Sequence, residues 1–260
     1  MQLGLEGRSA VVTGGSKGLG RAIALELASE GAAVAICSRR AEELIPVVRE
    51  IEAHSVPAFA GRADVTVAED VEAFLGAAAD ALGGIDILVN NAGGARPGRF
   101  EALTDKDWTT DLDTKLFSII RCVRAVLPHM RKRGGGRVIN IGAVQARSPD
   151  PVLCATTTIR AAGLSLTKVL AQQYGPENIL VNAVNIGLVT TPQWENIRAR
   201  TAPDSSLDEF TTAFAQREVP LGRFGRPDEV SGLVAFLAGD RASYLTGASI
   251  DVAGGMGRYV

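Results

Sequence analysis

A glycine-rich segment near the start of the chain contains residue types that can bring backbone amides against a phosphate group. It follows the apolar run 9–13 and precedes a segment of helical period. Glycine permits a tight turn and a close approach of the backbone to a ligand, and the amides at a helix N-terminus attract anions. This placement predicts the pyrophosphate site of a dinucleotide. The residues expected to contribute are Gly14, Ser16, Lys17, Gly18, Leu19 and Gly20.

Side chains after the second apolar run, 33–37, indicate which dinucleotide is bound. Ser38, Arg39 and Arg40 stand where an acidic residue would otherwise bind a ribose hydroxyl. Guanidinium groups bind phosphate in a fork geometry, and Lys17 could reach the same phosphate from the glycine turn. We therefore expect NADP(H) as the cofactor. The alternative is that the two arginines are solvated charges at the start of a helix.

Short apolar runs rich in β-branched residues alternate with longer segments of helical period along the chain. Such alternation implies right-handed crossovers and a parallel sheet that helices cover on both faces. We expect a single α/β domain over residues 1–260, a doubly wound Rossmann fold with a seven-stranded parallel sheet flanked by helices. Ligands of such sheets bind at the carboxyl ends of the strands, where both segments above would lie. The expected strands are 9–13, 33–37, 57–62, 85–90, 137–141, 180–185 and 249–252, and the expected helices are 19–30, 41–53, 68–82, 105–133, 156–174 and 228–239.

Composition and charge argue against several other classes of protein. The chain has 260 residues, of which 46% are hydrophobic and 22% charged, and its formal net charge is −2. Interspersed basic and acidic residues argue against a nucleic-acid partner. No apolar run reaches the roughly 18 residues of a membrane span, and the first residues do not resemble a signal peptide. The three cysteines lack metal-ligand spacing, so we expect a cytoplasmic protein with reduced thiols and no metal site.

One long stretch without regular period, residues 186–206, interrupts the alternation. A loop of this length inside a compact domain is often a lid or a binding segment. We therefore expect a lid or substrate segment at about residues 186–217, the alternative being a plain surface loop. Trp194, Phe210 and Phe214 could form an apolar wall for a substrate, although ordinary packing would explain the same residues.

These motifs, in this order, resemble those of the short-chain dehydrogenase/reductase family. Thr13-Gly14-x-x-x-Gly18-x-Gly20 is similar to its nucleotide-binding turn, and Asn90-Asn91-Ala92-Gly93 to the segment that lines the adenine ribose. The resemblance extends over about residues 7–255. It implies that Asp64 and Val65 contact the adenine and that residues 185–191 form the nicotinamide-side loop. The further cofactor contacts implied by the resemblance are Asn91, Ala92, Gly93, Gly187 and Thr191.

The same resemblance implies a catalytic tetrad of asparagine, serine, tyrosine and lysine, and this chain replaces every member. In the family, tyrosine donates a proton to a carbonyl oxygen that serine also binds, and lysine lowers the pKa of the tyrosine. The register places Thr156 at the tyrosine position and Arg160 at the lysine position. Ala143 falls at the serine position and Lys115 at the asparagine position. No shift of register restores the tetrad, because no tyrosine of the chain is followed four residues later by lysine.

Other side chains could take over parts of this chemistry. Lys115 could polarise a substrate oxygen, or it could form a salt bridge with Asp111 on the same helix. Asp150, between two prolines, could act as an acid or merely shape a turn. Thr156 is a much weaker acid than tyrosine, whereas Arg160 could hold ribose hydroxyls or an anion. Lys115, Thr156, Arg160 and Asp150 are thus the candidate catalytic residues.

Three functions are compatible with this combination of motifs. The first is an NADP(H)-dependent oxidoreductase with a relocated or unnecessary proton donor, which transfers hydride to a carbonyl, an imine or an activated alkene. The second is a non-redox enzyme on the same fold, such as a lyase, cyclase or dehalogenase. The third is a non-catalytic cofactor-binding subunit. The resemblance also implies a small-molecule substrate and a homodimer or homotetramer.

Overall fold

The computed structural model describes residues 2–257 and contains one parallel sheet of seven strands in the order β3-β2-β1-β4-β5-β6-β7. The strand order reverses between β1 and β4, and a doubly wound sheet binds its ligand at the carboxyl edge beside such a switch point. The predicted doubly wound α/β fold is confirmed. The strands are β1 (Ser9–Thr13), β2 (Ala33–Ser38), β3 (Ala58–Arg62), β4 (Ile87–Asn90), β5 (Gly136–Ala143), β6 (Ile179–Ile186) and β7 (Ser249–Val252).

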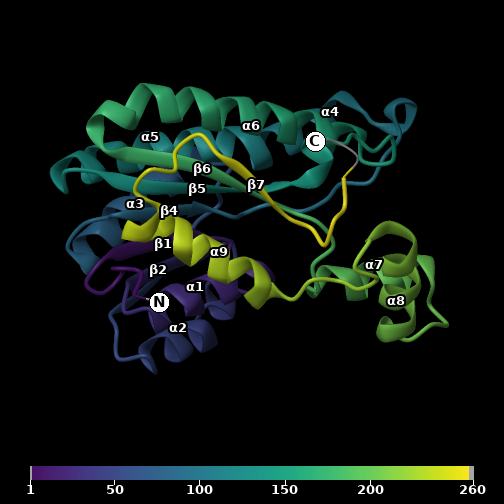
Figure 1. Cartoon of the computed structure of the whole chain (residues 1–260), viewed down its shortest axis with the longest axis horizontal. Coiled ribbons are helices and arrows are strands. Elements are labelled where there is room, and N and C mark those ends of the chain that lie inside the picture. Colours follow the sequence, from purple (N-terminus) through teal and green to yellow (C-terminus); the bar gives the residue numbers. More distant parts are fainter. Residues whose placement is uncertain (1, 258–260) are drawn as a thin grey trace.

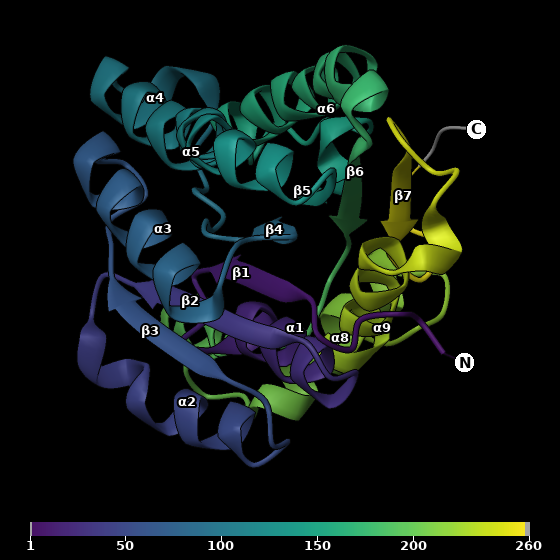
Figure 2. The same ribbon diagram turned by 90° about the vertical axis from the view of Figure 1, so that its left-hand side faces the viewer.

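Two layers of helices cover the sheet (Figures 1 and 2). One face packs against α1, α2 and α9, and the other packs against α3, α5 and α6. β1 and β4 are buried along their whole length between these layers, as their continuous apolar sequences predict. The helices are α1 (Gly18–Ser29), α2 (Ile45–Glu52), α3 (Ala68–Leu82), α4 (Asp105–Leu112), α5 (Ser118–Lys132), α6 (Cys154–Tyr174), α7 (Gln193–Thr201), α8 (Leu207–Glu218) and α9 (Pro227–Ala238).

The helix predicted over residues 105–133 contains one wide turn. A π-turn over Asp113–Phe117 separates α4 from α5, and the Ser118 amide bonds to the Asp113 carbonyl five residues earlier. π-turns are rare and occur frequently at functional sites. Lys115 lies within this one.

The stretch expected to be irregular contains α7, so that expectation is wrong over Gln193–Thr201. No residue of α7 is buried, and a helix that buries no apolar stripe gives no periodic signal in its sequence. The next helix, α8, begins with a capping box between Ser206 and Glu209, which is a recognisable start signal. Figure 1 shows α7 and α8 beyond the end of the sheet.

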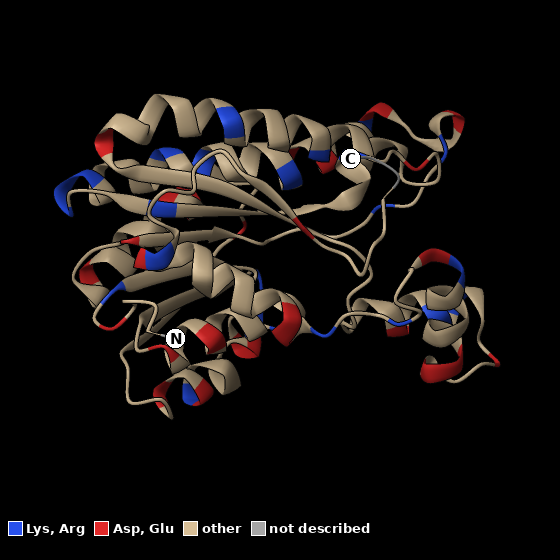
Figure 3. Ribbon diagram, viewed as in Figure 1, with Lys and Arg blue, Asp and Glu red and all other residues tan. Residues whose placement is uncertain are grey.

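Positions of basic and acidic residues are distributed over both layers of helices and over α7 and α8 (Figure 3). Among the described residues, no helix is long and apolar enough to cross a membrane.

Candidate active site

The glycine turn joins β1 to α1 at the switch point of the sheet. Gly14 has a φ of +68°, and a Cβ on Gly20 would lie 2.2 Å from the Gly14 carbonyl oxygen. The Asn91 side chain, at the end of β4, donates to the carbonyl oxygens of Thr13 and Gly14 at 2.9 and 3.2 Å. The Thr13 hydroxyl accepts from the amides of Asn91 and Ala92. Asn91 and Ala92 therefore fix the shape of the turn.

The N-terminus of α1 faces this turn and suits an anion. Its N-cap residue, Lys17, makes no side-chain capping bond, and the first turn of the helix contains no acidic residue. The first amides are therefore not capped by that side chain, which favours a pyrophosphate there. Leu19 is buried, so its side chain serves the core. A Cβ on Gly18 would lie 3.5 Å from Thr191, which places Thr191 against the glycine turn.

A carboxylate lies among the basic residues expected to bind the 2′-phosphate. Glu43, in a 3-10 turn over Ala41–Glu43, forms an ion pair with Arg40, and its other carboxylate oxygen accepts from the Ser16 hydroxyl at 3.2 Å. The Lys17 ammonium is 3.9 Å from the carboxylate. Glu43 is absent from the sequence-based site, and its only signal is the i,i+3 spacing from Arg40.

The remaining predicted cofactor residues lie at the same edge and make local contacts. The Ser38 hydroxyl donates to the Arg40 carbonyl at 2.6 Å. Arg39 is exposed. The Asp64 carboxylate, after β3, accepts from the amide and the hydroxyl of Thr66 at 2.9 and 2.7 Å, and Val65 is buried. A Cβ on Gly187 would lie 2.9 Å from the Ala253 backbone, so that close approach requires glycine.

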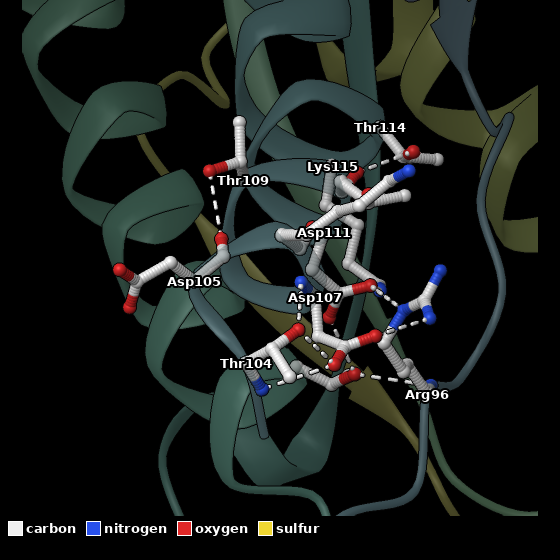
Figure 4. A network of polar contacts seen from close by, with 11 residues as sticks. Arg96, Thr104, Asp105, Asp107, Thr109, Asp111, Thr114 and Lys115 are labelled. Carbon is white, nitrogen blue, oxygen red and sulfur yellow. Dashed lines mark hydrogen bonds and ion pairs between the residues drawn. The ribbon is translucent and has the colours of Figure 1, made fainter.

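Two of the four candidate catalytic residues, Lys115 and Thr156, contact a buried carboxylate, that of Asp111. Figure 4 shows Lys115, Asp111 and Arg96 in this network. Lys115 forms an ion pair with Asp111, and the two side chains are only 1% and 4% exposed. The Thr156 hydroxyl, from α6, donates to the other Asp111 oxygen at 2.9 Å and accepts from the Arg96 amide at 3.2 Å. The Arg96 guanidinium lies 3.5 Å from Asp111. The salt bridge weighed as the alternative for Lys115 is therefore present, and polarisation of a substrate oxygen by Lys115 stays a prediction.

Burial changes the acidity of this lysine. Burial lowers the pKa of Lys115, the ion pair with Asp111 raises it, and the charges of Arg160 and Arg96 lower it, so that the pKa is about 8. An efficient general acid has a pKa near the working pH, since it must both give up a proton and regain one. Lys115 meets this condition, whereas the hydroxyl of Thr156 does not.

Arg160 lies beside Lys115 at the carboxyl ends of β4 and β5. Its guanidinium donates to the Ile141 carbonyl, while its Nε is buried without a hydrogen-bond partner among the described residues. A Cβ on Gly93 would lie 3.2 Å from Arg160 Nη2 and 4.0 Å from Lys115 Cγ. Burial lowers the pKa of Arg160 to about 10, so it remains a cation at neutral pH. Ala143, at the end of β5, offers a methyl group where a serine hydroxyl was implied.

Two other predicted features have structural partners. The Asp150 carboxylate accepts from the Val152 amide at 2.8 Å, which is turn chemistry. Trp194 packs with its ring centroid 5.6 Å from that of Phe214 and 4.8 Å from that of Phe224, and its indole donates to the Val189 carbonyl. These aromatic residues thus belong to a small core between α7, α8 and the body of the domain.

Several known reductases are similar to this chain over nearly its whole length. Residues 14–257 match the family described as enoyl-(acyl carrier protein) reductase. The 3-oxoacyl-[acyl-carrier-protein] reductase FabG of Staphylococcus aureus is 34% identical over 250 residues, which are 96% of this chain and 98% of that protein. The L-sorbose reductase of Gluconobacter frateurii, solved with NADPH and L-sorbose, has a TM-score of 0.97 at 31% identity, with 100% of both chains covered.

Another solved relative is described as containing an atypical catalytic center. This short chain oxidoreductase of Pseudomonas aeruginosa PAO1 is 37% identical, and its NADPH-bound structure has a TM-score of 0.90 over 97% of this chain and 98% of that one.

Proposed function

Because the chain belongs to the short-chain dehydrogenase/reductase family, we propose that it is an NADP(H)-dependent oxidoreductase in which Lys115 replaces tyrosine as the proton donor. The proposed reaction is hydride transfer to a carbonyl, an imine or an activated alkene. The observation that carries the proposal is the buried Lys115–Asp111 pair, in which the lysine pKa is lowered to about 8.

The residues at the switch point fit the proposed cofactor. The crowded glycine turn and the α1 N-terminus suit a pyrophosphate, and Lys17, Arg39 and Arg40 supply cations for a 2′-phosphate. The solved relatives from Gluconobacter frateurii and Pseudomonas aeruginosa contain NADPH, which supports the same choice here. Bound NADPH supplies a hydride.

The chain's own residues supply the proton and the charge stabilisation. As negative charge develops on the substrate oxygen or nitrogen, the Lys115 ammonium donates its proton and becomes a neutral amine, which solvent then reprotonates. Asp111 holds the ammonium in place, and Thr156 holds the second oxygen of Asp111. Arg160 remains a cation and stabilises the developing negative charge. An imine or an activated alkene needs less help from an acid than a ketone does, so these substrates belong in the same test.

The test combines cofactor binding with turnover. The purified protein is titrated with NADPH and NADH, followed by nicotinamide fluorescence, and then mixed with a panel of ketones, imines and activated alkenes. We expect NADPH to bind and one substrate class to oxidise it. Binding without oxidation of any substrate would favour the non-catalytic subunit, and product without a change in nicotinamide absorbance would favour a non-redox enzyme.

The role of Lys115 is tested by Lys115→Ala against Lys106→Ala, a matched removal of an exposed lysine on α4. Loss of a general acid should lower kcat by about 10²–10⁴ while the Kd for NADPH stays the same. Lys106→Ala should match the wild type in both quantities. If Lys115→Ala retains full kcat, another group supplies the proton.

A further inference from the structure

Three groups suited to binding a 2′-phosphate all contact one carboxylate in this structure. Glu43 forms an ion pair with Arg40, accepts from the Ser16 hydroxyl at 3.2 Å and lies 3.9 Å from the Lys17 ammonium. These partners come from two separate segments, the glycine turn and the loop after β2. The carboxylate therefore occupies the position where cations from both segments converge.

A carboxylate in this position uses the groups that a phosphate needs. Both oxygens of Glu43 are engaged, one by Arg40 and Lys17 and the other by Ser16. Partial burial raises the pKa of Glu43, but the hydrogen bonds from Arg40 and Ser16 and the charges of Lys17 and Arg40 outweigh it and lower the pKa below its ordinary value. Glu43 is thus an anion at neutral pH. Two anions repel each other at contact distance, so Glu43 and a 2′-phosphate exclude each other from these partners.

We propose that Glu43 is an internal competitor for the 2′-phosphate and thereby sets the affinity and selectivity for the cofactor; this rests on the proposed NADP(H) binding. A ligand that binds only when Glu43 has moved away has its apparent Kd raised in inverse proportion to the fraction of molecules in that state. NADH carries a hydroxyl at this position, and a hydroxyl can donate to a carboxylate. Glu43 therefore weakens NADPH binding but not NADH binding, and it narrows the preference between them.

The direct test is Glu43→Gln, which keeps the size of the side chain and removes its charge. Calorimetric titration at low ionic strength should show the Kd for NADPH falling about three- to tenfold, the range expected for loss of partly exposed charge contacts. The Kd for NADH should stay within about twofold of the wild type or rise. Glu42→Gln removes a charge from an exposed neighbour in the same turn, and neither Kd should change.

Smaller probes isolate the phosphate from the rest of the cofactor. Adenosine 2′,5′-bisphosphate should bind Glu43→Gln more tightly than wild type by the same factor as NADPH, whereas adenosine 5′-monophosphate should bind both proteins equally. Glu43→Ala provides a second variant, and thermal unfolding of each variant shows whether the fold is retained.

The failure of this inference is distinct from failure of the proposed function. If the wild type binds no NADPH at all, the cofactor assignment fails. If the wild type binds NADPH but Glu43→Gln binds it equally or less tightly, the competitor role is overturned, and Glu43 instead holds Arg40 and Lys17 ready for the phosphate. If Glu43→Gln increased the affinity for NADH by the same factor as that for NADPH, the competitor role would be overturned as well.

Discussion

The glycine turn after β1 and the polar cluster around Asp111 lie at the same edge of the sheet but depend on the sequence in different ways. The turn works through its backbone: Gly14 has a positive φ, Gly20 leaves no room for a side chain, and Asn91 ties the turn to β4. The cluster consists of side chains, and its proposed function depends on the acidity of Lys115 and on the groups that hold it.

This difference explains why one region follows the family pattern and the other departs from it. A backbone site is specified by a few glycines at fixed spacing, and the chain retains them. A side-chain site can exchange its residues if the new groups supply a proton and a positive charge at the same edge. In the proposed function Lys115 and Arg160 supply both, where the register predicted from the sequence leaves neither the tyrosine nor the lysine of the tetrad. Resemblance alone therefore identifies the first site, and the second requires geometry.

The largest expected effect comes from breaking the buried ion pair. Asp111→Ala leaves the Lys115 ammonium without its counterion, which should lower the free energy of unfolding by about 3–5 kcal/mol, measured by urea denaturation. The double variant Asp111→Leu, Lys115→Met should recover most of the lost free energy of unfolding. It should be inactive as a reductase, because it lacks the Lys115 ammonium. A stable Asp111→Ala protein would show that the pair contributes little to the fold.

The corresponding test of the backbone site is Gly20→Ala. The added Cβ would lie 2.2 Å from a backbone oxygen, so the turn must deform. We expect the free energy of unfolding to fall by about 1–3 kcal/mol and NADPH binding, measured by titration, to be lost. Gly76→Ala is the matched control, because nothing lies within 4 Å of its added Cβ in the middle of α3. That variant should be more stable than the wild type by about 0.5–1 kcal/mol. Equal changes in stability for Gly20→Ala and Gly76→Ala would contradict the close approach between Gly20 and the Gly14 carbonyl oxygen.

The pH dependence of reduction sharpens the assignment of the proton donor. Only the protonated Lys115 can donate, so kcat/KM for reduction should fall as pH rises through about 8. The fall should reach about tenfold for each further pH unit. Lys115→Arg keeps the charge but titrates far higher, so its residual activity should lack this descending limb. A limb that persists in Lys115→Arg belongs to another group.

The smallest expected effect is at the phosphate position. Arg40→Ala removes one partly exposed cation, so the Kd for NADPH should rise about three- to tenfold while the Kd for NADH remains unchanged. Titration with both cofactors at low and high salt measures this difference, which should shrink at high salt because screening weakens exposed charges. If the Kd values for NADPH and NADH rose by the same factor, the substitution would instead have damaged the glycine turn.

The features predicted correctly from sequence were the alternation of strands and helices, which indicates the doubly wound sheet, and the contacts within short segments. The glycine turn, the strand before it and the helix after it are adjacent in the chain, so spacing alone specifies their geometry. The Lys115–Asp111 pairing could be foreseen for the same reason, as residues four apart share a helix face. The hydrogen bond from Thr156 could not, because it joins residues 45 positions apart on different helices.

Two further differences have physical causes. Helix α7 buries no residue, so it leaves no apolar period to recognise. Glu43 has the form of an ordinary helix-start acid, and only the folding of the glycine turn against the loop after β2 brings Ser16 and Lys17 to it. The three-dimensional arrangement therefore gives this residue contacts that its local sequence does not indicate.

The π-turn makes the site depend on how this helix is wound as well as on its side chains. A π-turn holds one residue more than an α-helical turn, and each residue of an α-helix advances by roughly 100° around the axis. If the same residues, Asp113–Phe117, were wound as regular α-helix, the extra residue would rotate α4 by roughly that angle relative to α5. Asp111 would then no longer face Thr156, and Asp107 would no longer face Arg96, although every side chain would still be present. The extra residue of the π-turn changes which side chains face which neighbour along this helix. The polar face of α4 therefore contacts α6, and the apolar face of α5 packs against the sheet.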